Sequence, residues 1–218
     1  MESIGLLASQ EAYWNSVSEE KSFPLPLQME EFERYVSREM AILDIGCGYG
    51  RTLNELHDAG FENLFGIDFS QGMIDRGQRL HPHLYLRKND GSTLPFEDAS
   101  FDAVILIAVL TCIAESERQR QLMAEIERVL KKSGILYIDD YLLNTDERNI
   151  KRYNAAKEKY GVYGVFELPE GAVVRHHTEE HISDITAGFD RLAFETVIYT
   201  TMNGNRSNGF YYLGRKHA

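Results

Sequence analysis

The sequence predicts an α/β protein built on a doubly wound, mostly parallel sheet of seven strands with an antiparallel last strand. From residue 41 onward, short apolar runs alternate with segments of helical length, which is typical of parallel strands joined by helices. The first apolar run ends in a glycine-rich turn, as a buried strand does at the ligand-binding edge of such a sheet. The last two runs alternate polar and apolar residues and meet at a turn-rich connection, so they predict an antiparallel closing pair.

Capping residues and apolar periodicity place the individual elements. The strands are expected at residues 41–45, 63–68, 83–87, 102–108, 135–139, 192–202 and 209–215. Helices are expected at 52–59, which Gly60 ends, at 71–80, which Ser70 caps, and at 115–132, which Gly134 ends. A last helix, capped by Thr178, runs to about residue 186.

Two segments depart from the alternation, so we divide the single domain 1–218 into four parts. Residues 1–38 are helical in pieces, broken at 23–26, and their large apolar groups Tyr13, Trp14 and Phe23 either pin the segment to the domain or make it a lid. Residues 39–143 form the ligand-binding core. Residues 144–177 are a cap insertion with a helix at 146–160, whose interspersed charges suggest a solvated face. Residues 178–218 supply the final helix and strand pair.

Composition limits the class of function. The chain has 218 residues, 43% hydrophobic and 26% charged, which is ordinary globular composition. Its net charge of −11 repels phosphate backbones, so nucleic acid is not the expected partner. No signal-peptide pattern and no run of about 18 apolar residues occurs, so we expect no membrane contact. Cys47 and Cys112 lie in apolar segments and read as free thiols, which favours a cytoplasmic location.

The turn after the first strand has glycines at a characteristic spacing. From Asp44 the residues read D-x-G-x-G-x-G, with glycines at 46, 48 and 50, instead of the dinucleotide spacing G-x-G-x-x-G. Glycine lets the backbone approach a ligand closely, and an acid beside it can hold an ammonium group. Alternatively, the glycines only form a tight connection. Asp68, 22 residues after Gly46, ends the second strand, where an acid can accept hydrogen bonds from a ribose diol.

These motifs resemble those of the class I S-adenosylmethionine-dependent methyltransferases, a Rossmann-like family. A second resemblance is the run D-x-x-x-L-P-F-x-x-x-x-F-D, which starts at Asp90 and enters the fourth strand. The resemblance covers residues 41–140 by motif and implies that S-adenosylmethionine is the cofactor. The cofactor-binding residues expected from it and from the pattern above are Asp44, Gly46, Cys47, Gly48, Gly50, Asp68, Phe69, Met73, Asn89, Asp90, Gly91 and Ile107.

The catalytic residues are less defined. Cys112 stands where the family often has a histidine after the fourth strand, so no base is offered from that loop. Asp139, Tyr141 and His177 are the candidates, with His176 as an alternative to His177, and each can equally be structural. The string from His177 to His181 matches a zinc-peptidase motif, but Thr178 as helix cap places His177 outside the helix, so no metal is expected.

The expected reaction is methyl transfer to a small molecule, because the chain is acidic and lacks the motifs used to methylate nucleic-acid bases. A methyltransferase acting on protein or RNA and a non-catalytic adenosyl-cofactor-binding protein remain alternatives. A nicotinamide dehydrogenase would share Asp68 but not the glycine spacing. The identity of the acceptor and the oligomeric state stay open.

Overall fold

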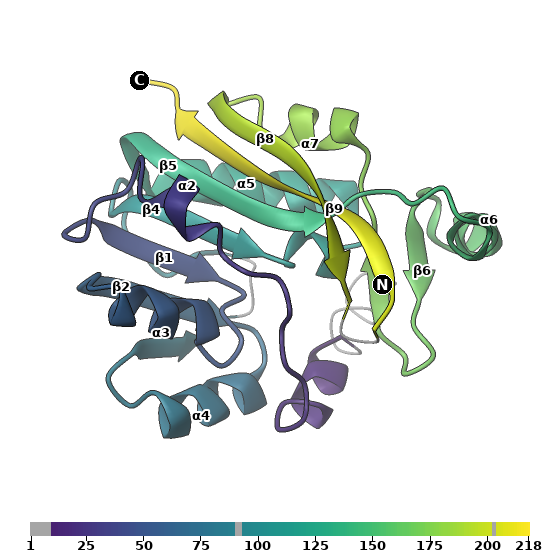
Figure 1. Cartoon of the computed structure of the whole chain (residues 1–218), viewed down its shortest axis with the longest axis horizontal. Coiled ribbons are helices and arrows are strands. Elements are labelled where there is room, and N and C mark those ends of the chain that lie inside the picture. Colours follow the sequence, from purple (N-terminus) through teal and green to yellow (C-terminus); the bar gives the residue numbers. More distant parts are fainter. Residues whose placement is uncertain (1–9, 90–92, 202–203) are drawn as a thin grey trace.

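A computed structural model describes residues 10–89, 93–201 and 204–218 of the chain. Seven strands form one sheet in the order β3-β2-β1-β4-β5-β9-β8 (Figure 1). Their bounds are β1 Ala41–Ile45, β2 Asn63–Asp68, β3 Tyr85–Lys88, β4 Phe101–Ile107, β5 Leu130–Tyr141, β8 Phe189–Thr200 and β9 Arg206–Lys216. β1 to β5 pair in parallel, whereas β9 runs antiparallel to both β5 and β8. The predicted fold class is confirmed.

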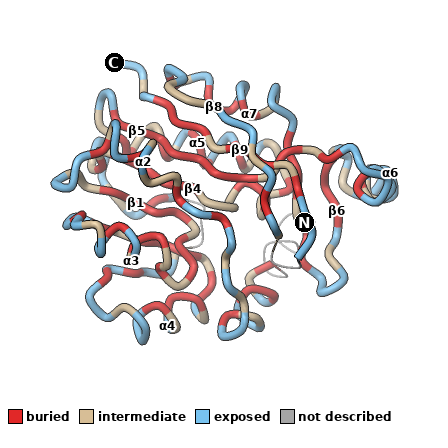
Figure 2. Tube along the Cα trace, viewed as in Figure 1, coloured by how far each residue is buried: buried red, intermediate tan, exposed pale blue. Residues whose placement is uncertain are grey.

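Helices cover both faces of the sheet, because alternate strand residues point to opposite sides. Ile42 of β1 packs with α2 Met29–Phe32 and α3 Arg51–Asp58, together with α4 Gln71–Leu80. Leu43 and Ile45 pack on the opposite side, with α5 Ser116–Val129 and α7 Glu179–Ile185. The central strands are accordingly buried along most of their length (Figure 2). No helix within the described ranges is both long and apolar enough to cross a bilayer.

The junction between α5 and β5 differs from the prediction. The helix ends at Val129 instead of residue 132, and Gly134 does not end it. Leu130 is already a strand residue opposite Phe101, and a register shift separates that pair from the pairing of Ala103 with Ile135. Burial of Leu130 against the sheet therefore overrides the helical periodicity that included it.

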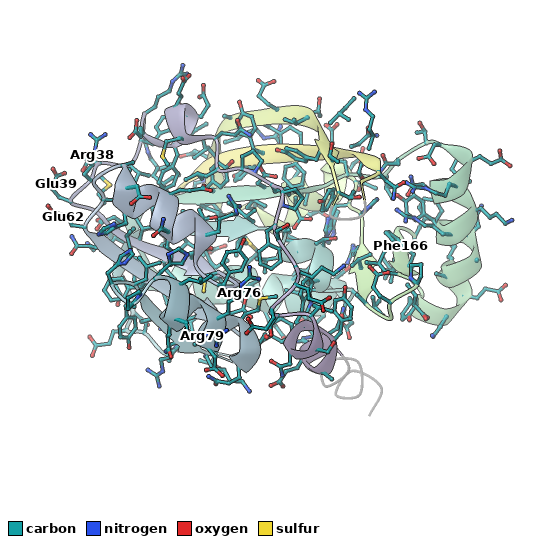
Figure 3. All side chains as sticks on the ribbon, turned by 60° about the horizontal axis from the view of Figure 1, so that its bottom comes forward. Arg38, Glu39, Glu62, Arg76, Arg79 and Phe166 are labelled. Carbon is teal, nitrogen blue, oxygen red and sulfur yellow. The ribbon has the colours of Figure 1, made fainter. Side chains whose placement is uncertain are left out.

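The N-terminal segment lies across the carboxyl side of the sheet and is held there by α4. Residues 10–16 are helical, and α2 is a second short helix, so the segment is helical in pieces on either side of residues 23–26. Arg76 of α4 donates to the carbonyl oxygens of Ser18 and Lys21 at 2.8 and 2.7 Å (Figure 3). Its guanidinium also lies 3.9 Å from the centre of the Tyr49 ring. The segment is therefore tied to the core by charge-assisted hydrogen bonds and a cation–π contact.

The insertion after β5 forms a separate small layer at one end of the molecule (Figure 1). It contains α6 Glu147–Tyr160 and a two-stranded antiparallel sheet of β6 Val165–Glu167 and β7 Val173–Arg175. The helix predicted at 146–160 is present: Asp146 caps α6 by accepting from the amide of Asn149, and Gly161 ends it in a left-handed conformation. A buried amide, Asn144, joins this layer to β9 by donating to Ser207 Oγ at 2.9 Å.

Candidate active site

A cavity of about 620 Å³ opens at the carboxyl edge of the parallel strands. Three parts of the chain wall it. The core contributes residues from the ends of β1, β2, β4 and β5, the N-terminal segment contributes residues 10–25, and the insertion contributes α6 and the β6–β7 pair. The β8–β9 connection adds Thr201, Asn205 and Ser207. Ligands bind at this edge of open α/β sheets because loops and helix N-termini converge there.

The glycine turn is shaped by close approach as well as by backbone conformation. Gly46 and Gly48 have φ of 71° and 56°, the left-handed region that favours glycine. A Cβ atom at Gly46 would lie 2.6 Å from Val109, and one at Gly48 would lie 2.6 Å from the Phe23 ring. The turn therefore has no room for side chains on either side, and its backbone faces the cavity directly at Gly46 and Cys47.

Two buried carboxyls flank this turn. Asp68 accepts from the amide of Gly48 at 2.9 Å and from the amide of Ser70 at 2.8 Å. Burial raises the pKa of Asp68 to about 6, although these amides oppose the shift. Burial raises the pKa of Asp44 to about 8, and the nearby Arg51 guanidinium opposes that shift. Both acids line the cavity, so a cationic ligand would stabilise their ionised forms.

Arg51 lies at the start of α3, opposite these acids. It pairs with Glu55 at 2.8 Å and donates to the carbonyl oxygen of Leu25. Its Nε atom is buried without a hydrogen-bond partner among the described residues. Because a buried donor without a partner is costly, this nitrogen is suited to an anionic group of a ligand, such as a carboxylate.

The structure brings most of the predicted cofactor residues together. The cavity is lined by Asp44, Gly46, Cys47, Asp68, Phe69, Met73, Asn89 and Ile107. Gly48 and Gly50 shape the turn but do not line the cavity, and Gly50 serves as N-cap of α3. Asp90 and Gly91 lie outside the described residues.

The three catalytic candidates fall in different places. Tyr141 lines the cavity, and burial and nearby acids raise its pKa, so its hydroxyl stays protonated. Asp139 is buried beneath it and accepts from Tyr199 at 2.8 Å, away from the cavity wall. The ring of His177 points to the opposite side, where its Nδ1 donates to the Tyr141 carbonyl at 3.2 Å and Gln119 lies 3.0 Å from its Nε2. Asp139 and His177 thus do not line this cavity.

Gln119 also explains the string that resembles a zinc-peptidase motif. Its amide oxygen accepts from His181 Nε2 at 2.6 Å, while its amide nitrogen contacts His177. The two histidine rings stack with centroids 5.7 Å apart, on a side of the molecule that the cavity does not reach. These contacts join α5 to α7 and give the motif a structural role.

Several residues that line the cavity were not predicted from the sequence. Arg148 and Arg152 were assigned to a solvated face, yet both line the cavity from α6. Their spacing of one helical turn was the available signal, because residues four apart share a helix face. Thr201, Asn205 and Ser207 left no sequence signal, since their position depends on how far the β8–β9 hairpin reaches over the site.

Comparisons with known proteins identify the family. Residues 43–138 match the family described as Methyltransferase domain. A methyltransferase of Encephalitozoon cuniculi is 30% identical over 173 residues, which cover 68% of this chain and 78% of that protein. The solved structure of an S-adenosylmethionine-dependent methyltransferase from Methanosarcina mazei is similar with a TM-score of 0.84 and 25% identity, covering 88% of this chain and 99% of that one. The chain belongs to the S-adenosylmethionine-dependent methyltransferases of class I, and S-adenosylmethionine is its cofactor.

Other relatives differ in what their names say they methylate. The demethylmenaquinone methyltransferase of Renibacterium salmoninarum is 34% identical over 100 residues, 46% of this chain and 40% of that protein. The eEF1A lysine and N-terminal methyltransferase of Mus musculus is 30% identical over 115 residues, 48% of this chain and 16% of that protein. This chain thus covers less than half of each of these two proteins, and their names include both a small and a protein acceptor.

The cavity fits the cofactor of this family. S-adenosylmethionine carries an ammonium, a sulfonium, a carboxylate, a ribose diol and an adenine ring. The wall offers buried acids for the cationic and hydroxyl groups, the orphaned Arg51 Nε for the carboxylate, and the apolar pair Phe69 and Met73 for the adenine.

Proposed function

We propose that this methyltransferase acts on a small organic molecule held between the N-terminal segment and the insertion. One observation supports this above the others: the cofactor cavity is walled opposite the sheet by residues of both segments, including Trp14, Phe23, Phe166 and Leu168. A largely apolar cavity that two segments cover in part suits a small organic ligand. In this proposal residues 1–38 act as the lid and residues 144–177 as the cap.

The cofactor would bind through residues of the core. We assign the ribose diol to Asp68, the adenine to Phe69 and Met73, and the methionine end to the glycine turn with Arg51. The assignment of the ribose to Asp68 is supported by the two amides that already fix its carboxylate at the cavity wall. A preorganised acceptor of this kind loses little freedom when a ligand binds.

The residues that line the cavity support a mechanism in which the protein aligns the acceptor with the cofactor. When bound, the cofactor supplies an electrophilic sulfonium methyl group, so the protein has to orient the acceptor and exclude water. Burial raises the pKa of Cys112 and of Tyr141, so both are protonated at neutral pH and neither can accept a proton. An acceptor that is already nucleophilic needs no base from either of these side chains.

A protein acceptor is the second candidate, because one relative is named for methylation of eEF1A. Tritium-labelled S-adenosylmethionine separates the two. The enzyme is incubated with the small-molecule fraction of a cell extract and, separately, with the dialysed protein fraction. We expect label transfer to the small-molecule fraction and none above background to the acid-precipitated protein.

The reverse distribution would overturn the small-molecule proposal in favour of the protein acceptor. Transfer to neither fraction by an enzyme that binds S-adenosylhomocysteine would support a non-catalytic binding protein instead. A cytoplasmic location and the absence of a nucleic-acid partner remain predictions from composition, and an RNA fraction in the same assay tests the second.

A further inference from the structure

The insertion places two arginines at one end of the cavity. Arg148 and Arg152 lie one helical turn apart on α6 and both line the cavity. The Arg152 guanidinium stacks on the Phe166 ring, with its carbon 3.5 Å from the ring centre; Phe166 itself lies beside α6 (Figure 3). Its Nε atom is buried without a hydrogen-bond partner among the described residues. Stacking holds the planar group in a fixed orientation, in which the Nε–H is left for a ligand.

His176, which also lines the cavity, presents a further hydrogen-bond donor. His176 Nδ1 lies 3.2 Å from Asn144 Nδ2, an amide nitrogen that can only donate, and 2.6 Å from the Tyr153 hydroxyl, so this ring nitrogen is the acceptor. Burial lowers the pKa of His176 to about 3, so the ring is neutral. A neutral ring that accepts at Nδ1 carries its proton at Nε2. His176 therefore offers an N–H group, and its other nitrogen is occupied.

The acids around this end are already engaged. Glu167 pairs with Lys159 and accepts from the Tyr160 hydroxyl at 2.6 Å. Asp146 accepts from Asn149 as the cap of α6, and its Oδ1 also lies 3.9 Å from Arg148 Nε, at the limit of an ion pair. Glu170 pairs with Lys21 at 3.5 Å. Positive charge thus gathers at one end of a cavity in a protein whose net charge is −11. An anionic ligand would supply the compensating charge.

We propose that the methyl acceptor is a small carboxylic acid with an apolar body, whose carboxylate binds to Arg152 with help from Arg148 and the Nε2–H of His176. Arginine matches a carboxylate with two parallel hydrogen bonds, and the remaining wall of Tyr141, Phe166 and Val174 suits an apolar body. A carboxylate is ionised at neutral pH, so it supplies the negative charge that this end of the cavity lacks. This inference rests on the proposed small-molecule function and names the chemistry of its acceptor.

Matched pairs of acids and amides test the proposal. Benzoate, phenylacetate and hexanoate are titrated against benzamide, phenylacetamide and hexanamide, each into the protein saturated with S-adenosylhomocysteine, with affinity measured by ligand-observed NMR. We expect each acid that binds to bind at least about tenfold more tightly than its amide, since hydrogen bonds to charged groups are involved. Arg152→Gln should remove this preference, and Arg148→Gln should reduce it severalfold.

The control is Lys151→Gln, which makes the same change in charge at an exposed position of α6 that does not line the cavity. It should leave the preference for acids intact. Phenylphosphonate is a further probe, and tighter binding of it than of benzoate would assign the site to a phosphate group and overturn the carboxylate.

The titration of S-adenosylhomocysteine separates failure of the function from failure of the inference. A folded protein that does not bind S-adenosylhomocysteine would contradict the cofactor site itself. Intact S-adenosylhomocysteine binding with no acid bound, or with amides bound equally well, would overturn the carboxylate proposal alone. Loss of S-adenosylhomocysteine affinity in Arg152→Gln would show that the arginine is structural, and this too would overturn it.

Discussion

Asp68 shows how one side chain can shape a turn and still serve a ligand. Each carboxylate oxygen has two lone pairs, and the amides of Gly48 and Ser70 use one on each oxygen. The remaining lone pairs can accept from the two hydroxyls of a ribose. Sequence reasoning identified this residue because its position depends only on the end of β2, which the apolar pattern places correctly.

We therefore expect Asp68→Asn to weaken S-adenosylhomocysteine binding by at least about tenfold, since each lost charge-assisted hydrogen bond contributes roughly 1.5–3 kcal/mol. The introduced NH2 group would also face the amide donor of Gly48 or Ser70. Calorimetric titration measures the effect, with the exposed Asp75→Asn on α4 as control. Unchanged affinity in folded Asp68→Asn would remove the ribose assignment.

His176 and His177 mark the limit of prediction at this scale. They are neighbours, so their side chains point in different directions: His176 lines the cavity and His177 contacts Gln119 on the other side. The sequence named both but could not choose, because the orientation depends on how the end of the insertion meets β5. The parallel bridge between Leu142 and His177 sets that orientation in the fold.

Among the elements, the glycine turn and the end of α6 offer a matched comparison. Gly48 and Gly161 have similar positive φ values of 56° and 67°. A Cβ atom at Gly48 would collide with Phe23 of the N-terminal segment, whereas at Gly161 nothing lies within 4 Å. Alanine at either position has the backbone strain of about 1 kcal/mol, and only at Gly48 does it also displace the Phe23 ring.

Gly48→Ala should accordingly lower the affinity for S-adenosylhomocysteine by at least about tenfold, whereas Gly161→Ala should lower only the melting temperature, by a few degrees. Thermal unfolding and calorimetry on both variants separate strain from collision. Equal cofactor affinities in the two variants would show that contact between Phe23 and the turn is not needed for binding.

Element boundaries were predicted well where capping residues define them and poorly where packing does. Ser70 and Thr178 cap their helices as expected, because the capping hydrogen bond is local. The α5–β5 boundary was wrong because Leu130 satisfies a helical pattern equally well, and only its burial opposite Phe101 assigns it to the sheet. The inward side of α6 was missed for the same reason, since the stacking of Arg152 on Phe166 is a tertiary contact.

In the whole molecule, buried carboxyls concentrate around the cavity end of the sheet. Burial raises the pKa of Asp44 and Asp139 to about 8, of Asp140 to about 7 and of Asp68 to about 6. Their unfolded values lie near 4. Between pH values of about 4 and about 8 the folded protein binds more protons than the unfolded chain. Its free energy of unfolding therefore falls as the pH rises through this range.

The contribution of one buried carboxyl to this pH dependence can be tested at Asp139, because this residue does not line the cavity. Its Oδ2 accepts from Tyr199 at 2.8 Å and from Tyr137 at 3.4 Å, while its Oδ1 is buried without a partner among the described residues. Asp140 raises its pKa further and Arg51 opposes the shift. Ionisation therefore places a partly unsatisfied charge in the core, which asparagine would avoid while its carbonyl still accepts from a tyrosine.

We expect Asp139→Asn to raise the free energy of unfolding by about 1–3 kcal/mol at pH 8 and to change it little at pH 4, where the acid is protonated in the folded state. Urea unfolding of the ligand-free protein at pH 4, 6 and 8 measures the difference, with the exposed Asp184→Asn of α7 as control. A stabilisation that does not grow with pH would mean that Asp139 is not ionised in the folded protein over this range. Destabilisation at every pH would instead show that an amide cannot replace the carboxyl group as the partner of the two tyrosines, so that this acid belongs to the structural support of the cavity.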